Sequence, residues 1–199
     1  MLSDEDTAMN QKNLLEVDWS KIPAPSDDGA AAHLKGMTIP AISLVATDDT
    51  SVDLSALPGR TIVFAYPRTG EPGKISLVDD WDMIPGARGC TPQTCAFRDL
   101  FAELKAAGAR QVFGLSTQSN EYQTEMASRL HLPFPVLSDE SLRLTRVLNL
   151  PTMDVAGLTM IKRLALVIDD ARITHVFYPV FPPDRNAGDV LAWLKDNPV

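Results

Sequence analysis

The only two cysteines of the chain lie five residues apart, in the run Gly89-Cys90-Thr91-Pro92-Gln93-Thr94-Cys95. Cys90 falls where a helix is expected to begin, and the unpaired backbone N–H groups of a helix start favour an anion. The thiolate is the reactive form of cysteine, and its oxidation gives a sulfenic acid that a second thiol can convert to a disulfide. The pattern therefore predicts a redox-active thiol at Cys90 that Cys95 resolves.

The spacing makes this hypothesis more specific. On an intact helix the two Cα atoms would lie roughly 8–9 Å apart, whereas a disulfide usually requires less than about 7 Å. The first helical turns must therefore unwind each time the bond forms. One alternative is that the cysteines are two buried small apolar residues. A metal site fits poorly, because His33, His131 and His175 are scattered and give no compact zinc spacing.

Composition limits the classes of function. The 199 residues carry a formal net charge of −8 and 45 % hydrophobic residues, which suits a globular protein and disfavours nucleic acid and anionic membranes as partners. No apolar run is long enough to span a bilayer, and the acidic start lacks the order of a secretory signal. We therefore expect a cytoplasmic protein, where a close cysteine pair is more often catalytic or metal-binding than a permanent crosslink.

The chain divides into an arm and one domain. Residues 1–32 are polar and contain Pro23 and Pro25, which predicts a flexible N-terminal arm. Its apolar residues either pack onto the body or a second subunit, or the arm is disordered. These apolar residues are Leu14, Leu15, Val17 and Trp19. Residues 33–199 form the folded domain.

Strand and helix patterns alternate along this domain. Apolar β-branched runs predict strands, with Pro135 indicating an edge or irregular strand. Apolar residues at helical spacing predict helices, which Thr91 and Asn186 are expected to cap. The predicted strands are 61–66, 111–115, 134–137, 164–168 and 173–178, the last two joined as a hairpin, and the predicted helices are 91–107, 121–130, 140–148 and 186–194. This order is an α/β fold with a central mixed β-sheet flanked by helices, which resembles the thioredoxin-like fold.

The run 89–99 after a strand ending Tyr66-Pro67 resembles the peroxiredoxins, and most closely their Q-type group, the bacterioferritin-comigratory proteins. The resemblance covers roughly residue 36 to the C-terminus and includes the run 160–169. It implies that Cys90 is the peroxidatic cysteine, that Cys95 is the resolving cysteine and that Arg163 is the active-site cation. A guanidinium there would stabilise the thiolate and donate to both peroxide oxygens. An exposed Arg163 on an edge strand is the alternative.

One part of the family pattern is missing. The peroxiredoxins carry a threonine three residues before the peroxidatic cysteine, in a short loop that begins with proline, but here that position is Ala87. Pro67 and Thr69 lie before a long insertion, residues 68–88. We predict that both contribute to substrate binding, with Pro67 shielding the thiolate and Thr69 folding back to supply the hydroxyl; an ordinary loop threonine is the alternative. The insertion is either a lid or partner-facing loop over the pocket, or a segment that only packs on the surface.

The resemblance implies a thiol-dependent peroxidase that needs no metal, haem or flavin. Its substrates would be hydrogen peroxide or organic hydroperoxides, and a dithiol protein of the thioredoxin or glutaredoxin type would reduce the Cys90–Cys95 disulfide. The chain would act as a monomer or homodimer. A redox-sensing or regulatory protein with little turnover is the alternative, and the missing threonine and the insertion motivate it.

Overall fold

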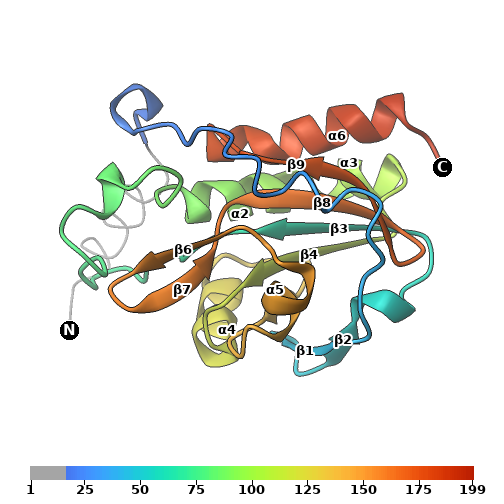
Figure 1. The fold of residues 1–199 in the computed structure, drawn as a ribbon, viewed down its shortest axis with the longest axis horizontal. Helices are drawn as coiled ribbons and strands as arrows, with labels where there is room; N and C mark the ends of the chain where they lie inside the picture. The colour runs from blue at the N-terminus through green and yellow to red at the C-terminus, as the bar shows by residue number, and fades with distance from the viewer. Residues whose placement is uncertain (1–16) are drawn as a thin grey trace.

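The computed structural model describes residues 17–199, so Leu14 and Leu15 of the predicted arm lie outside the described residues. The ribbon in Figure 1 shows strands at the centre and helices around them. In chain order the elements are η1 (Trp19–Lys21), β1 (Ser43–Ala46), β2 (Ser51–Asp53), η2 (Leu54–Ala56), β3 (Arg60–Ala65), η3 (Trp81–Met83), α2 (Cys90–Asp99), α3 (Phe101–Ala106), β4 (Gln111–Ser116), α4 (Asn120–Arg129), β5 (Val136–Ser138), α5 (Arg143–Leu148), β6 (Thr152–Val155), β7 (Leu158–Ile161), β8 (Leu164–Asp169), β9 (Arg172–Phe177), η4 (Pro183–Arg185) and α6 (Asn186–Asp196).

Seven of the described strands form one mixed sheet in the order β2-β1-β5-β4-β3-β8-β9. The β3–β4 and β4–β5 pairs are parallel, and the remaining pairs are antiparallel. Every residue of β3 is buried, as expected for an uninterrupted apolar run in a central strand. The predicted α/β fold with a central mixed sheet is confirmed.

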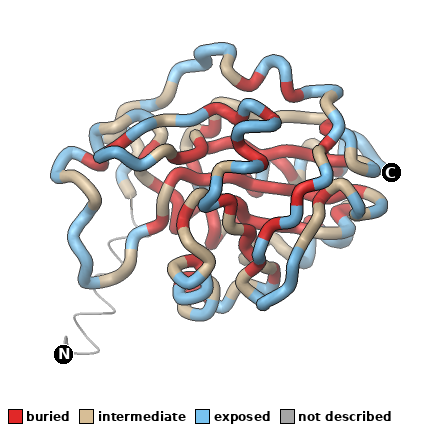
Figure 2. The backbone as a smooth tube through the Cα atoms, turned by 60° about the horizontal axis from the view of Figure 1, so that its bottom comes forward, coloured by how far each residue is buried: buried red, intermediate tan, exposed pale blue. Residues whose placement is uncertain are grey.

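The two faces of the sheet bury separate apolar clusters, because side chains alternate along each strand. On one face Phe64 of β3 stacks on Phe97 of α2, with ring centroids 4.1 Å apart, and α3, α4 and α6 complete this cluster. The opposite face is covered by α5 and by apolar residues between 31 and 54. Buried residues follow the central strands in Figure 2. The sheet thus fixes the positions of α2 and of the loop before β8.

Several local predictions differ from the structure. The predicted helix 91–107 is two helices, because the backbone turns at Leu100, which ends α2 and begins α3. For Pro135 the edge position is wrong, because β5 lies between β1 and β4, but the irregular position holds, because Pro135 precedes the strand. Asn186 does not cap α6 but occupies its first turn, with its side chain bonded to Gln93. The β1–β2 and β6–β7 hairpins were not predicted, since their strands have only three or four residues.

The predicted hairpin of the last two strands is confirmed. Asp169 at the end of β8 pairs with Arg172 at the start of β9. The two intervening residues, Asp170 and Ala171, have φ of 45° and 66°. Two successive residues with positive φ are the signature of the tight turn whose twist matches that of paired strands.

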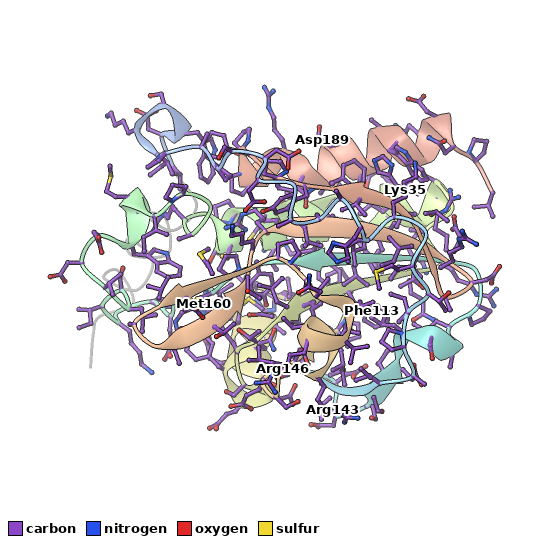
Figure 3. All side chains as sticks on the ribbon, in the orientation of Figure 1. Lys35, Phe113, Arg143, Arg146, Met160 and Asp189 are labelled. Atoms are coloured by element: carbon purple, nitrogen blue, oxygen red, sulfur yellow. The ribbon has the colours of Figure 1, made fainter. Side chains whose placement is uncertain are left out.

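The insertion 68–88 is a packed structure with its own small apolar cluster. Trp81 and Ala87 from this segment are buried against Val155 and Met160 of the β6–β7 hairpin. Figure 3 labels Met160 on β7, on the side of the molecule where the insertion lies. The hairpin therefore supports the segment that leads into α2.

Residues 17–32 of the predicted arm lie against the body. Ala31 belongs to the cluster on the α5 side of the sheet, and Trp19 contacts Phe181 with ring centroids 6.0 Å apart. Across residues 17–199, no helix has the length and apolar character that a membrane span requires.

The ends of β3 and β8 are joined by an ion pair that we expect to stabilise the sheet. Arg60 donates from Nε and Nη2 to Asp169, over 2.7 and 3.1 Å, and this hydrogen bonding lowers the pKa of the Asp169 carboxyl below 3.8. Asp169→Asn should lower the free energy of unfolding by about 1–3 kcal/mol at neutral pH. The fold favours the ionised form of Asp169. The difference in the free energy of unfolding between wild type and variant should therefore be complete above the ordinary pKa of the carboxyl, and it should vanish as the pH falls through the lowered pKa.

Urea denaturation at neutral pH and at about pH 3 measures this difference. Glu103→Gln, on the exposed side of α3, is the control and should change neither value. An equal loss of stability in Asp169→Asn at both pH values would contradict the ion-pair account.

Candidate active site

Cys90 is the first residue of α2, and its side chain is buried, with 3 % of its surface exposed. Gly89 precedes the helix with φ of 104°, a conformation that glycine adopts without strain. Thr91 was expected to cap the helix but lies in its first turn, and no side chain caps this helix. Because they lie in the first turn, the backbone N–H groups of Cys90 and Thr91 have no intrahelical acceptor.

Arg163, which lies between β7 and β8, reaches the thiol. Its Nη2 is 3.2 Å from Cys90 Sγ and also lies 3.0–3.2 Å from the carbonyl oxygens of Gly86, Ala87 and Arg88. Only 2 % of Arg163 is exposed, so the alternative of an exposed surface arginine is wrong. The loop before α2 thus wraps the guanidinium and presents it to the sulfur.

No carboxylate among residues 17–199 is ion-paired with Arg163. Instead Arg163 Nη1 donates to Gln93 Oε1, and Gln93 Nε2 donates to Asn186 Oδ1 over 2.9 Å. Gln93 and Asn186 are both buried. A buried cation held only by neutral groups favours an anion beside it, and Cys90 is the adjacent group that can become one.

Cys95 lies on the same helix, one and a half turns after Cys90, and both thiols are free. Burial raises the pKa of the Cys95 thiol, so Cys95 is protonated at neutral pH while this fold is intact. The α-helix runs without interruption from Cys90 to Asp99. The structure is therefore the reduced state, in which the two sulfurs are held apart by helix geometry.

A cavity of about 230 Å³ opens beside Cys90. Its lining combines cations, apolar side chains and one tyrosine, and most of it comes from the insertion. The lining includes Arg68, Thr69, Glu71, Lys74, Ile75, Leu77, Trp81, Arg88, Cys90 and Tyr122. Arg68 lies over the ring of Tyr122, 5.0 Å from its centroid. The insertion thus forms a wall of the pocket in addition to packing on the β6–β7 hairpin.

The two predicted substrate-binding residues differ in position. Thr69 is buried in the wall of the Cys90 cavity, but its hydroxyl donates to Gln118 Oε1 over 3.1 Å, and Tyr122 donates to its carbonyl. Pro67 is buried and lines a neighbouring cavity with Gln118. Substrate binding by Thr69 and Pro67 stays a prediction, and the Thr69 hydroxyl must leave Gln118 before it can donate to a substrate.

The histidines lie in unrelated places. His33 bonds to the Leu148 carbonyl, and His175 stacks on Trp193. In the described part of the chain, no three His, Cys, Asp or Glu side chains gather in a way that could hold a metal ion.

Sequence reasoning missed the polar residues that support the site: Gln93, Gln118, Tyr122 and Asn186. One of them carried a usable signal. Gln93 follows Cys90 by three residues, so on a helix both must share a face. Asn186 and Tyr122 reach the site only through tertiary packing, which no local pattern reveals.

Comparison with known proteins agrees with this geometry. Residues 34–191 match the Redoxin family. The chain is similar to a chloroplastic peroxiredoxin Q of Sedum lineare, 31 % identical over 81 % of this chain and 77 % of the relative. It is also similar to peroxiredoxin Bcp of Escherichia coli (strain K12), 32 % identical over 81 % of this chain and 96 % of the relative. The crystal structure of peroxidoxin BcpB from Mycobacterium tuberculosis superposes with a TM-score of 0.67, at 27 % identity over 84 % of this chain and 100 % of that one.

Proposed function

Since the chain belongs to the Redoxin family and is a thiol peroxidase of the peroxiredoxin Q/Bcp type, we propose that Cys90 reduces hydroperoxides and that Cys95 resolves the product as an intramolecular disulfide. The observation that carries this proposal is the contact between Arg163 Nη2 and Cys90 Sγ, 3.2 Å long, at the start of α2. This contact places the sulfur that would act as the nucleophile next to a positively charged guanidinium.

The first step transfers one oxygen atom. The Cys90 thiolate attacks the nearer peroxide oxygen, the S–O bond forms and the O–O bond breaks. The leaving oxygen takes both bonding electrons and a proton, so the products are a sulfenic acid at Cys90 and water or an alcohol. Burial raises the pKa of the Cys95 thiol, which disfavours Cys95 as the attacking thiol.

Arg163 stabilises the charge that moves in this step. Its planar fork can donate to the sulfur before the reaction and to the peroxide oxygens during it. The guanidinium is buried and fixed by carbonyl oxygens and Gln93, so little reorganisation is needed in the transition state. Preorganised donors of this kind are typically the largest single contribution to catalysis.

The second step joins the two cysteines. The Cys95 thiol condenses with the Cys90 sulfenic acid, forming the S–S bond and releasing water. Helix geometry keeps the Cα atoms roughly 8–9 Å apart, which exceeds the reach of a disulfide, so the first turns of α2 must unwind. A dithiol protein of the thioredoxin or glutaredoxin type would then reduce the disulfide to two thiols. We propose that the chain acts in the cytoplasm, as a monomer or homodimer.

Intact-mass measurement tests the assignment of the two cysteines. After one equivalent of hydrogen peroxide, the reduced protein should lose two hydrogen atoms, as one intramolecular disulfide requires. Cys95→Ser should instead gain one oxygen atom at Cys90, which a sulfenic-acid reagent captures.

Two results would count against the proposal. If the oxidised wild type gained oxygen atoms but lost no hydrogen atoms, the proposed Cys90–Cys95 disulfide would be wrong. If the wild type were oxidised stoichiometrically but turned over negligibly with thioredoxin, thioredoxin reductase and NADPH, the redox-sensing alternative would hold. That alternative is motivated by the Thr69 hydroxyl, which donates to Gln118.

A further inference from the structure

The segment 17–28, here called the N-terminal strap, crosses the outside of the loop that leads into α2, the helix that begins at Cys90. In Figure 1 it is the first coloured part of the chain, at the end of the molecule where α2 begins. Its contacts lie at two points, around Trp19 and around Pro25 to Asp28. Trp19, Pro25 and Asp28 do not line the cavity beside Cys90.

At the first point the Trp19 ring closes over Gly89. A Cβ atom on Gly89 would lie 2.7 Å from Trp19 Cη2 and 2.6 Å from Pro183 Cγ, which is too close for any side chain. Gly89 therefore fits a slot between the indole and the proline ring. The residue in this slot is the one that immediately precedes Cys90.

The indole is fixed from behind. Trp19 Nε1 donates to Asp184 Oδ2 over 2.9 Å, and the ring meets Phe181 edge to face at 79°. Asp18 accepts from the backbone N–H of Ser20 and so caps the short η1 helix that carries the tryptophan. The ring is thus held between the strap and the segment before α6.

At the second point, hydrogen bonds hold the strap next to the neighbour of Arg163 in the chain. Asp28 accepts hydrogen bonds from Lys162 Nζ over 2.6 Å and from the Tyr178 hydroxyl over 2.7 Å, and Lys162 is the residue before Arg163. Pro25 lies 3.7 Å from where a Cβ of Gly86 would be. The strap therefore spans residues 86–89, and three of their carbonyl oxygens, those of residues 86–88, accept hydrogen bonds from the Arg163 guanidinium.

The start of α2 is held from both sides, by Arg163 inside and by Trp19 outside. Disulfide formation requires this turn to open. We propose that Trp19 is a positioning residue that keeps the first turn of α2 wound and thereby sets the rate at which the Cys90 sulfenic acid reaches Cys95. This inference rests on the proposed Cys90–Cys95 disulfide.

The rate of opening decides which of two reactions the Cys90 sulfenic acid undergoes: disulfide formation or further oxidation. Condensation with Cys95 gives the disulfide and water. If opening is slow, the sulfenic sulfur attacks a second hydroperoxide, breaks its O–O bond and becomes a sulfinic acid, with water or an alcohol released. A strap that slows opening therefore makes the enzyme more sensitive to inactivation by excess peroxide.

Rapid acid quench followed by intact-mass analysis separates these steps in the full chain, with hydrogen peroxide as the oxidant. Removing the indole lowers the free energy of local opening. In Trp19→Ala we expect disulfide formation to be about tenfold faster, with the sulfinic fraction at high peroxide reduced by a similar factor. The rate of sulfenic acid formation should stay within about twofold of the wild type, because Trp19 does not line the cavity beside Cys90.

Two further variants keep the test independent of folding defects. Asp184→Asn retains the indole but weakens its anchor, and should shift the partition in the same direction by a smaller factor. Trp193→Phe removes an indole on α6 that stacks on His175, and should leave both rates unchanged. Far-ultraviolet circular dichroism and thermal melts check that each variant is folded.

Each outcome decides the question. Unchanged or slower disulfide formation in Trp19→Ala, while the wild type forms the disulfide, overturns the role of Trp19 and leaves the proposed function intact. A tenfold loss in sulfenic acid formation places Trp19 in the peroxide step and overturns the inference. A wild type that forms no disulfide overturns the inference and the proposed mechanism together.

Discussion

Replacing Cys90 with serine is expected to lower peroxide turnover by at least about a thousandfold, to the uncatalysed background. A serine hydroxyl stays protonated at neutral pH, so no anion forms beside Arg163 and no sulfur is available to accept the oxygen atom. The side chain is only 3 % exposed, and serine fits the same space. The measurement is NADPH consumption with thioredoxin, thioredoxin reductase and hydrogen peroxide.

The matched control is Cys95→Ser. It should lose steady-state turnover through the disulfide but keep a single rapid reaction with one equivalent of peroxide, because Cys90 and Arg163 are unchanged. Peroxide consumption by Cys90→Ser at the wild-type rate would identify Cys95 as the attacking thiol. That result would conflict with the burial that raises the pKa of Cys95.

The central fold could be predicted because its strands are continuous apolar runs and its helices carry apolar residues at helical spacing. The run 61–66 coincides with β3, which is buried along its whole length, and the hairpin at 169–172 is confirmed by its register. The β6–β7 hairpin was missed because its strands have only four residues each, and it packs against the insertion. Its stability comes from tertiary contact, which a local pattern does not contain.

Only part of the candidate site was predicted, because its other residues also come together through tertiary contacts. Cys90 and Cys95 stand out because they are the only cysteines, and the family resemblance pointed to Arg163, which the structure places next to Cys90 Sγ. The supports of this arginine come from distant parts of the chain. Gln93 lies 70 positions from it, and Asn186 lies 93 positions from Gln93, so only the folded chain brings them together.

The break at Leu100 shows how a wrong prediction bears on function. Apolar spacing predicted one helix to residue 107, but the chain turns at Leu100, so α2 is a separate helix of ten residues. When the first turns of a ten-residue helix open, the few residues that remain are too short to be stable as an isolated helix. The element that must unwind if the proposed disulfide forms is not continuous with a longer helix.

The second large effect is expected at Arg163. Arg163→Met should lower kcat/KM for hydrogen peroxide by about 10²–10³-fold, the loss typical of removing one preorganised donor from a transition state. The wild-type guanidinium is 2 % exposed and contacts the sulfur directly. Stopped-flow measurement of Cys90 oxidation gives this rate without interference from the reductant.

Two further variants distinguish the chemistry of the arginine from its packing. Arg163→Lys restores a positive charge but not the planar fork, so it should recover only part of the loss. Thr69→Val removes a hydroxyl that donates to Gln118, and we expect a loss below about tenfold because the hydroxyl is already committed elsewhere. A Thr69→Val loss as large as that of Arg163→Met would show that the threonine hydroxyl turns to the peroxide during the reaction. Full activity in Arg163→Met with an intact fold would leave the helix start alone to stabilise the anion, and the arginine would then serve only to bind the three carbonyl groups of the loop before α2.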